Sequence, residues 1–185
     1  MKKISIIILL SCICFFSNSS LAYSEVNVLL HITGIPGESK EAGYENWIDI
    51  LSFSWQVSNP DVGNTTPGTG TGAAIVRPLI VTKYIDKASP SLTLNVLTGQ
   101  HIDEAILIAM APGIDQIPYL KITMSNVRVA NVSPGGGYGD LRVAESVALT
   151  FSRVCYSYTP QKEDGSAGAE IVKCYDIEKN VPITP

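Results

Sequence analysis

Few residues in this chain have the chemistry for catalysis or metal binding. It contains two histidines, His31 and His101, and four cysteines. A zinc or general-base site needs several such groups at a defined spacing, and the stretch from His101 to Glu104 lacks the zincin pattern. We therefore expect both histidines to be structural.

The common catalytic and phosphate-binding motifs are also missing from the sequence. No serine lies in a G-x-S-x-G elbow, and there is no Walker A lysine. Residues 68–73 (GTGTGA) loosely fit a dinucleotide fingerprint, but they precede a predicted strand instead of following one and opening a helix. Glu38, Glu41 and Glu45 lack the spacing of an EF-hand, which favours solvated loop charge over calcium. We predict no enzyme, no cofactor and no metal site.

Composition narrows the class of protein. Of 185 residues, 45% are hydrophobic and only 16% charged, with a net charge of −4. The low charge fraction argues against disorder, a coiled coil or a charge-laced helical bundle, and the acidic balance argues against nucleic-acid binding. Fifteen Gly and eleven Pro favour strands and turns.

The N-terminal segment is typical of a secretory signal peptide. Lys2 and Lys3 precede an apolar run of about 13 residues, which is too short to span a bilayer. Small residues precede the predicted cleavage between Ala22 and Tyr23. A lipoprotein tethered at Cys12 and a retained membrane anchor are the open alternatives.

Cleavage divides the chain into a leader, residues 1–22, and one domain, residues 23–185. The mature protein is expected to be periplasmic or secreted, without stable membrane insertion. It keeps two cysteines, Cys155 and Cys174, and an even pair in an oxidising compartment suggests a disulfide.

The sequence between the two cysteines predicts that they pair. Asp164 and Gly165 are a strong hairpin-turn signal. If they are the two central residues of the turn, Cys155 and Cys174 face each other in the hydrogen-bonded phase, with Cα atoms about 5.5 Å apart. That distance is feasible for a disulfide, although the side-chain vectors suit it less well than those of a non-hydrogen-bonded pair. The alternative is two small side chains packed side by side.

Alternating apolar and polar residues predict about seven strands. In the second strand we expect Trp47, Leu51, Phe53, Trp55 and Val57 to share the core face, broken only by Asp49. The predicted strands are residues 26–33, 47–58, 73–84, 101–111, 118–132, 140–158 and 169–177.

The segments between these strands are predicted to be loops, apart from one short helix. Ser89 is the expected N-cap, Pro90 the first helical residue and Gly99 the left-handed stop. Residues 59–72 are expected to form a flexible loop, and residues 135–139 a hairpin tip. The three aromatics Trp47, Phe53 and Trp55 could stack on a sugar, but core packing is the favoured interpretation. The sum is a mainly β fold, a barrel or a sandwich.

Six stretches of the sequence, in this order, resemble the Hcp family, the haemolysin co-regulated proteins of type VI secretion. The resemblance runs from about Val28 to Val181. The stretches are residues 32–39 (ITGIPGES), 47–56 (WIDILSFSWQ), 82–90 (TKYIDKASP), 98–105 (TGQHIDEA), 145–151 (ESVALTF) and 158–167 (YTPQKEDGSA).

The resemblance implies a β-barrel of two packed antiparallel sheets with one short α-helix on its side. It also implies assembly with copies of itself into six-subunit rings that stack into a tube, effectors as cargo, secretion-apparatus partners and no catalytic site. By the same resemblance, residues 38–46 match a loop that reaches a neighbouring ring. The expected assembly residues are Glu38, Ser39, Lys40, Glu41, Tyr44 and Glu45.

The predicted leader departs from the family, whose tube subunits load in the cytoplasm without a cleavable signal. We therefore expect an exported Hcp-like protein that self-associates as a tube component, or as a secreted effector or effector carrier. The alternative is a monomeric secreted or periplasmic binding module for a glycan or protein ligand, with Tyr138 as the candidate contact.

Overall fold

The computed structural model describes residues 26–59, 74–111 and 117–185. These residues form twelve strands and one helix. The elements are β1 (Asn27–Ile32), β2 (Ile48–Ile50), β3 (Ser52–Ser54), β4 (Val57–Ser58), β5 (Ile75–Val76), β6 (Leu79–Tyr84), α1 (Ser89–Thr98), β7 (Ile102–Met110), β8 (Pro118–Gly135), β9 (Ala144–Thr150), β10 (Arg153–Tyr158), β11 (Ile171–Asp176) and β12 (Val181–Ile183).

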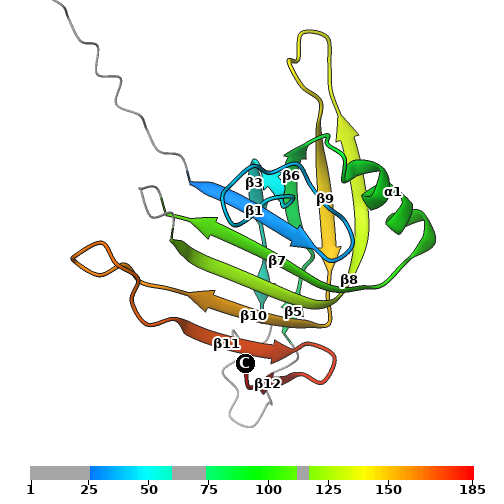
Figure 1. Ribbon diagram of the computed structural model, residues 1–185. Helices are drawn as coiled ribbons and strands as arrows, with labels where there is room; N and C mark the ends of the chain where they lie inside the picture. Colours follow the sequence, from blue (N-terminus) through cyan, green and yellow to red (C-terminus); the bar gives the residue numbers. More distant parts are fainter. Residues whose placement is uncertain (1–25, 60–73, 112–116) are drawn as a thin grey trace, which may run out of the picture.

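Two antiparallel sheets share the long strand β8 (Figure 1). One sheet has the order β12-β11-β10-β8-β7-β1-β2, and the other consists of β3, β6, β9 and the second half of β8. The register of β8 against β9 shifts between Val129 and Asn131, near the point where β8 passes from one sheet to the other. The mainly β, antiparallel fold with one short helix is as predicted.

The second predicted strand is wrong in one respect, because the chain turns a corner inside it. Ile48 and Ile50 of β2 are buried, whereas Leu51 and Val57 are each 51% exposed. At Leu51 the chain leaves β1 and begins to pair with β6, and strands that switch sheets bend at such corners. The inward face therefore changes, and Asp49, between the two buried isoleucines, points to solvent.

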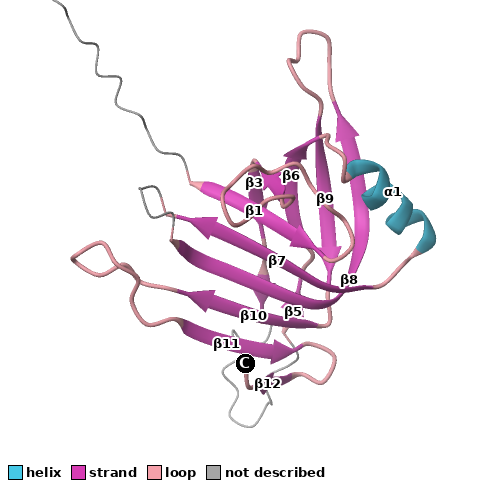
Figure 2. Ribbon diagram, in the orientation of Figure 1, coloured by secondary structure: helices cyan, strands magenta, loops and turns pink. Residues whose placement is uncertain are grey.

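The core lies between the two sheets and is completed by helix α1, which packs on the side of the barrel against β8 (Figure 2). A smaller apolar cluster of Leu29, Ile108 and Met110 lies on the opposite face of β1 and β7. Both faces of β1 are therefore buried. The largest side chains of the main core with under 2% exposure are Leu30, Ile32, Ile48, Leu79, Leu92, Leu107, Ile122, Met124 and Leu149.

The start of helix α1 differs from the prediction. Its N-cap is Ala88, whose N–H donates to Asp86 Oδ1 at 2.9 Å, and the Ser89 side chain does not cap the helix. Instead, the Ser89 hydroxyl donates to Glu145 Oε1 at 2.6 Å. The predicted stop is confirmed, because Gly99 has φ 64° in the left-handed region.

Ser89 belongs to a buried ionic network that the sequence analysis missed. The Lys83 side chain is 1% exposed, and its ammonium donates to Glu145 Oε1 at 2.8 Å and to Asp86 Oδ1 at 2.7 Å. A further hydrogen bond of 3.2 Å reaches the Ser89 hydroxyl. The network joins β6, β9 and the start of α1, so it fixes the helix to the second sheet.

The hairpin that joins β10 to β11 has the predicted cysteine pairing but a different turn. Lys162 N–H donates to Ser166 O at 2.9 Å, which leaves three central residues, the last being Gly165 with φ 84°. Such three-residue turns end in a left-handed glycine. One extra residue on the second strand, between the Gln161–Ala167 bridge and Ile171, restores the register in which Cys155 faces Cys174.

The predicted hydrogen-bonding phase of the cysteines is also wrong. Ile177 N–H donates to Ser152 O at 2.8 Å, and the phase alternates along the strand, so the cysteines three residues further along form a non-hydrogen-bonded pair. Their Cα atoms are 4.0 Å apart, closer than the hydrogen-bonded phase allows.

Candidate functional site

The predicted assembly loop, residues 38–46, is folded back on its own subunit. Gly37 N–H donates to Asn46 O at 2.7 Å, and Ser39 N–H donates to Trp47 O at 2.9 Å. A Cβ at Gly37 would clash with the backbone carbonyl oxygen of Trp47, so the loop closes only with glycine at this position. Ser39, one of the predicted assembly residues, is 4% exposed and holds the loop together instead of facing outward.

Three more of the predicted assembly residues are engaged within the chain. Glu38 Oε1 accepts the Lys87 N–H at 3.1 Å, and Glu41 Oε2 accepts the Asn27 amide at 2.8 Å. Tyr44 packs edge-on against Trp47 with ring centroids 5.0 Å apart.

Lys40 and Glu45, the remaining two predicted assembly residues, are exposed. The exposed surface of the loop therefore carries these two charges and Glu38, beside the half-buried Tyr44.

A second candidate contact element is the ribbon formed by β4 and β5. These strands pair only with each other, outside the two main sheets. Val57 and Ile75 on the ribbon are 51% and 39% exposed. Its base is held where Trp55 Nε1 donates to Arg77 O at 3.1 Å.

The sequence analysis did not single out this ribbon. The predicted flexible loop, residues 59–72, lies outside the described residues except for Asn59. β-branched residues on both sides of that Gly- and Thr-rich stretch were the signal for a hairpin.

The three aromatics considered as a sugar platform are not on one surface. Trp47 lies outside the main core, with Tyr44 and with His31 at a centroid distance of 5.2 Å. Phe53 and Trp55 pack against the main core. Trp55 stacks on Tyr156 at 6.4 Å, which links the base of the ribbon to β10.

The tip between β8 and β9 is a hairpin tip, as predicted, and it projects from the barrel (Figure 1). Its Tyr138 and Leu141 side chains are fully exposed. Asp140 Oδ2 accepts the Gly137 N–H at 2.6 Å, which orders the turn. This tip is the most exposed apolar feature among the described residues.

His101 lies apart from His31, at the start of β7. His101 Nδ1 is 2.8 Å from Asn126 Oδ1, and Arg128 Nε donates to His101 Nε2 at 2.9 Å. Within residues 26–59, 74–111 and 117–185, no three His, Cys, Asp or Glu side chains are grouped so that they could hold a metal ion.

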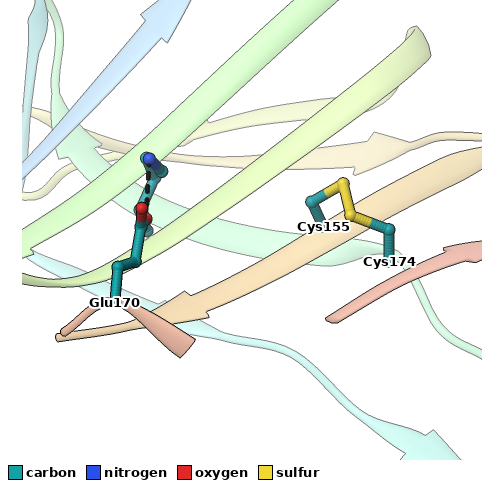
Figure 3. The surroundings of a disulfide bond; sticks show 4 residues. Cys155, Glu170 and Cys174 are labelled. Carbon is teal, nitrogen blue, oxygen red and sulfur yellow. Dashed lines mark ion pairs between the residues drawn. A yellow bond between two sulfur atoms is a disulfide. The ribbon is translucent and has the colours of Figure 1, made fainter. Parts of the chain in front are cut away.

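Cys155 and Cys174 are joined by a disulfide bond of 2.07 Å between β10 and β11 (Figure 3). Next to it along these strands, Arg153 Nε lies 3.1 Å from Asp176 Oδ2. On the other side, Lys121 and Glu170 form an ion pair of 2.9 Å in which both side chains are 41% exposed, drawn as a dashed line in Figure 3. A third, longer pair joins Lys179 to Asp176 at 3.8 Å, so one covalent bond and three ion pairs hold the edge of the main sheet.

Two carboxylates near this edge have lowered pKa values. The backbone N–H of Lys179 donates to Asp176 and lowers the pKa of that carboxyl, and a side-chain hydrogen bond from Arg153 acts in the same direction against the effect of burial. A hydrogen bond from Lys121 holds the pKa of Glu170 below its ordinary value. Both groups favour the ionised form that these pairs require.

A hollow of about 400 Å³ separates the closed loop from the hairpin between β10 and β11. Its lining is largely apolar, from Trp47 and Tyr44 on the loop and Ile106 and Ile108 on β7, with the Lys121–Glu170 pair among its lining groups. None of the residues that line the hollow is a histidine or a cysteine.

A two-sheet antiparallel barrel with one side helix and projecting hairpins is the architecture of a class of type VI secretion proteins. A structure described as "Structure of a type six secretion system protein" superposes with a TM-score of 0.80, at 25% identity over 86% of this chain and all of that chain. The crystal structure of Hcp1 from Salmonella typhimurium gives a TM-score of 0.72 at 33% identity, covering 85% of this chain and 99% of that chain.

The sequence comparisons agree with the structural ones. The family model described as "Type VI secretion system effector, Hcp" matches residues 29–158. Protein hcp1 of Pseudomonas aeruginosa is 39% identical over 158 residues, which are 84% of this chain and 98% of that protein. The chain belongs to the Hcp family, which confirms the resemblance and the predicted barrel.

Membership of this family assigns the chain to type VI secretion. The Hcp family is structural and secreted, and it is not a family of enzymes. The matched residues begin after the predicted cleavage point and end at 158, so Cys155 lies within the match and Cys174 beyond it.

Proposed function

We propose that this chain is a non-enzymatic subunit of type VI secretion that assembles with copies of itself into a six-subunit ring. The role is that of a tube component, or of a secreted effector or effector carrier. The observation that carries the proposal is the ribbon β4–β5, which lies outside both sheets with Val57 and Ile75 exposed. An isolated two-stranded ribbon is marginally stable in water, so it gains from packing against a neighbour.

A closed ring requires two different surfaces of one subunit to meet. Helix α1 offers a second apolar surface, because Leu94 and Leu97 are 57% and 78% exposed. The helix carries no charged residue, and it lies on another side of the barrel from β5 (Figure 1). The ribbon of one copy and the helix of the next are therefore the contact that we propose.

Light scattering on dilute purified mature protein tests the ring. We expect a mass near six subunits, and we expect Val57→Lys and Leu97→Lys each to lower it, because a charge at an apolar contact opposes its burial. Val26→Lys is the matched control, since Val26 is 49% exposed at the start of the domain. A monomer at micromolar concentration, or an equal effect of all three substitutions, contradicts the proposal.

The exported form is a separate part of the proposal. Residues 1–22 have the pattern of a secretory leader, and a disulfide between Cys155 and Cys174 suits an oxidising compartment. No helix among the described residues is long and apolar enough to cross a membrane. Mass spectrometry of the mature N-terminus tests this: Tyr23 as the first residue supports export, a lipid-bearing Cys12 indicates tethering, and an intact Met1 contradicts both.

A second candidate function is a monomeric binding module for a glycan or a protein. The full exposure of Tyr138 at the β8–β9 tip favours it. In this case Tyr138→Ala abolishes ligand binding without lowering the melting temperature. Ring formation by the wild-type protein, with unchanged mass in Tyr138→Ala, argues for the first function.

A further inference from the structure

The last strands of the chain are weakly anchored to the barrel. In β11 only Cys174 and Asp176 are buried, and the three residues of β12 are exposed or half-buried. Tyr175 and Ile177 add partial contacts with the core. A segment with few buried side chains and mostly exposed backbone ladders opens more readily than the core strands do.

Most of the polar anchors at this edge are partly exposed and therefore weak. The Asp176 side chain is 3% exposed, but its partner Arg153 is 54% exposed, and both members of the Lys121–Glu170 pair are 41% exposed. Exposed ion pairs contribute little because water competes for both charges. The disulfide is the one covalent anchor between β10 and β11.

The strand beneath this segment would be a free edge without it. β10 pairs with β8 on one side and with β11 on the other, over six residue pairs each. If β11 leaves, the backbone groups of β10 that face it lose their partners, and an open edge of this kind pairs readily with a strand of another chain. Tyr156 of β10 also stacks on Trp55 at the base of the ribbon.

We propose that the Cys155–Cys174 bond is a redox lock that keeps β11 and β12 on the edge of the main sheet. In a reducing compartment a dithiol breaks the S–S bond, each cysteine gains a hydrogen as a thiol, and the dithiol becomes a disulfide. The terminal strands then open far more often and expose the edge of β10. In an oxidising compartment a disulfide-bearing partner oxidises the two thiols, is itself reduced to a dithiol, and the edge closes again.

The size of the effect follows from the length of the closed loop. The cysteines are 19 residues apart, and closing a loop of this length stabilises the closed state by a factor on the order of 100 in the chain-entropy model. Reduction should therefore raise the opening equilibrium of β11 and β12 by about 100-fold. β7 and β8 are paired on both sides, so they open only when the whole barrel unfolds, and their exchange should stay far slower than that of residues 171–183.

Hydrogen exchange followed by mass spectrometry tests the lock in the mature protein. The samples are the oxidised protein, the same protein with dithiothreitol, and Cys155→Ser/Cys174→Ser. We expect faster exchange in residues 171–183 of the last two samples, with β7 and β8 remaining far slower than these residues. Thr123→Ala is the matched control, because Thr123 faces Cys155 from β8 without taking part in the bond.

Two results would overturn the lock. Equal exchange in residues 171–183 with and without dithiothreitol means that the bond does not hold the segment. Exchange in β7 and β8 that becomes as fast as exchange in residues 171–183 means that reduction opens the whole barrel and not its edge. The lock does not rest on ring formation, and repeating the measurement on Val57→Lys, with the mass of each sample determined, separates failure of the lock from failure of the ring.

Discussion

Two regions of this barrel are held by opposite means. At the joint of β6, β9 and α1, Lys83 and Glu145 are 1% and 3% exposed and share a closed set of hydrogen bonds. At the edge formed by β10 and β11, the ion pairs are partly exposed and the holding contact is a disulfide. The first region depends on burial, and the second depends on the redox state of its surroundings.

The contrast indicates which region of the molecule should respond to solvent and redox conditions. A buried ion pair is costly to break because the remaining charge has no solvent to stabilise it. At the edge, Asp176 is buried, but Arg153, Lys121 and Glu170 are partly exposed, so water can replace part of their polar contacts. We therefore expect a graded series of effects, which begins at the buried network and ends at the exposed pair.

The largest loss is expected for Lys83→Met. The substitution leaves the Glu145 carboxylate buried without its cation, and this should lower the free energy of unfolding by about 3–5 kcal/mol. Urea titration measures it. Lys87→Met is the control, because the exposed Lys87 reaches only Asn46 Oδ1 at 3.0 Å, and should cost under about 1 kcal/mol. Equal losses in the two variants would remove the contrast between buried and exposed charge.

A smaller loss, about 3 kcal/mol, is expected for Cys155→Ser/Cys174→Ser. Removing the cross-link frees the unfolded chain, so the urea dependence should also become steeper as more surface is exposed. Dithiothreitol should shift the wild-type curve to that of the variant and leave the variant unaffected. If dithiothreitol leaves the urea unfolding curve of the wild-type protein unchanged, the bond does not contribute to stability.

Lowering the pH should reduce the stability of the fold through Asp176, at the edge of the main sheet. Its pKa in the folded protein lies below the ordinary 3.8, so its carboxylate stabilises the fold above that value. This contribution is lost as the pH falls through the folded pKa. Asp176→Asn should therefore be less stable than wild type at neutral pH and lose less stability below pH 3.8. Glu178→Gln, an exposed neighbour, should keep the wild-type acid dependence; the same flattening in both variants would count against Asp176.

The smallest effect is expected at the Lys121–Glu170 pair. Lys121→Met should leave the urea midpoint within its experimental scatter, because both side chains are 41% exposed. The same variant should raise the pKa of Glu170 toward its ordinary value, since the Lys121 hydrogen bond is the main cause of the lowering. An NMR titration of Glu170 checks this. An unchanged pKa would place the cause elsewhere.

The sequence was informative where a local rule settles the structure. Gly99 ends the helix because only a residue that tolerates positive φ suits that position. The cysteine pairing was predicted correctly, although the turn has three central residues instead of two. The pairing held because an extra residue in the second strand offsets the longer turn.

The sequence was misleading where distant segments decide the outcome. The corner at Leu51 depends on β6 being present to pair with β3, and no local pattern shows this. Ser89 is a residue type that favours the N-cap position, but its hydroxyl accepts a hydrogen bond from Lys83 and donates one to Glu145 instead. The loop of residues 38–46 is polar in sequence, yet it closes over Leu29 with Tyr44 and Trp47 packed against the cluster.

By itself, the sequence determined the mainly β class, the short helix and the family. These follow from periodicity, from the conformations that glycine and proline allow, and from six matching stretches. The sequence also predicted that Cys155 faces Cys174, but this register depends on an extra residue in the second strand. Only the tertiary structure decided which face of the second predicted strand is buried and that Lys83 is buried. It also decided that β4 and β5 pair with each other and with neither main sheet. Those features depend on contacts between strands far apart in the chain, and burial is a property of the assembled barrel and not of any one segment.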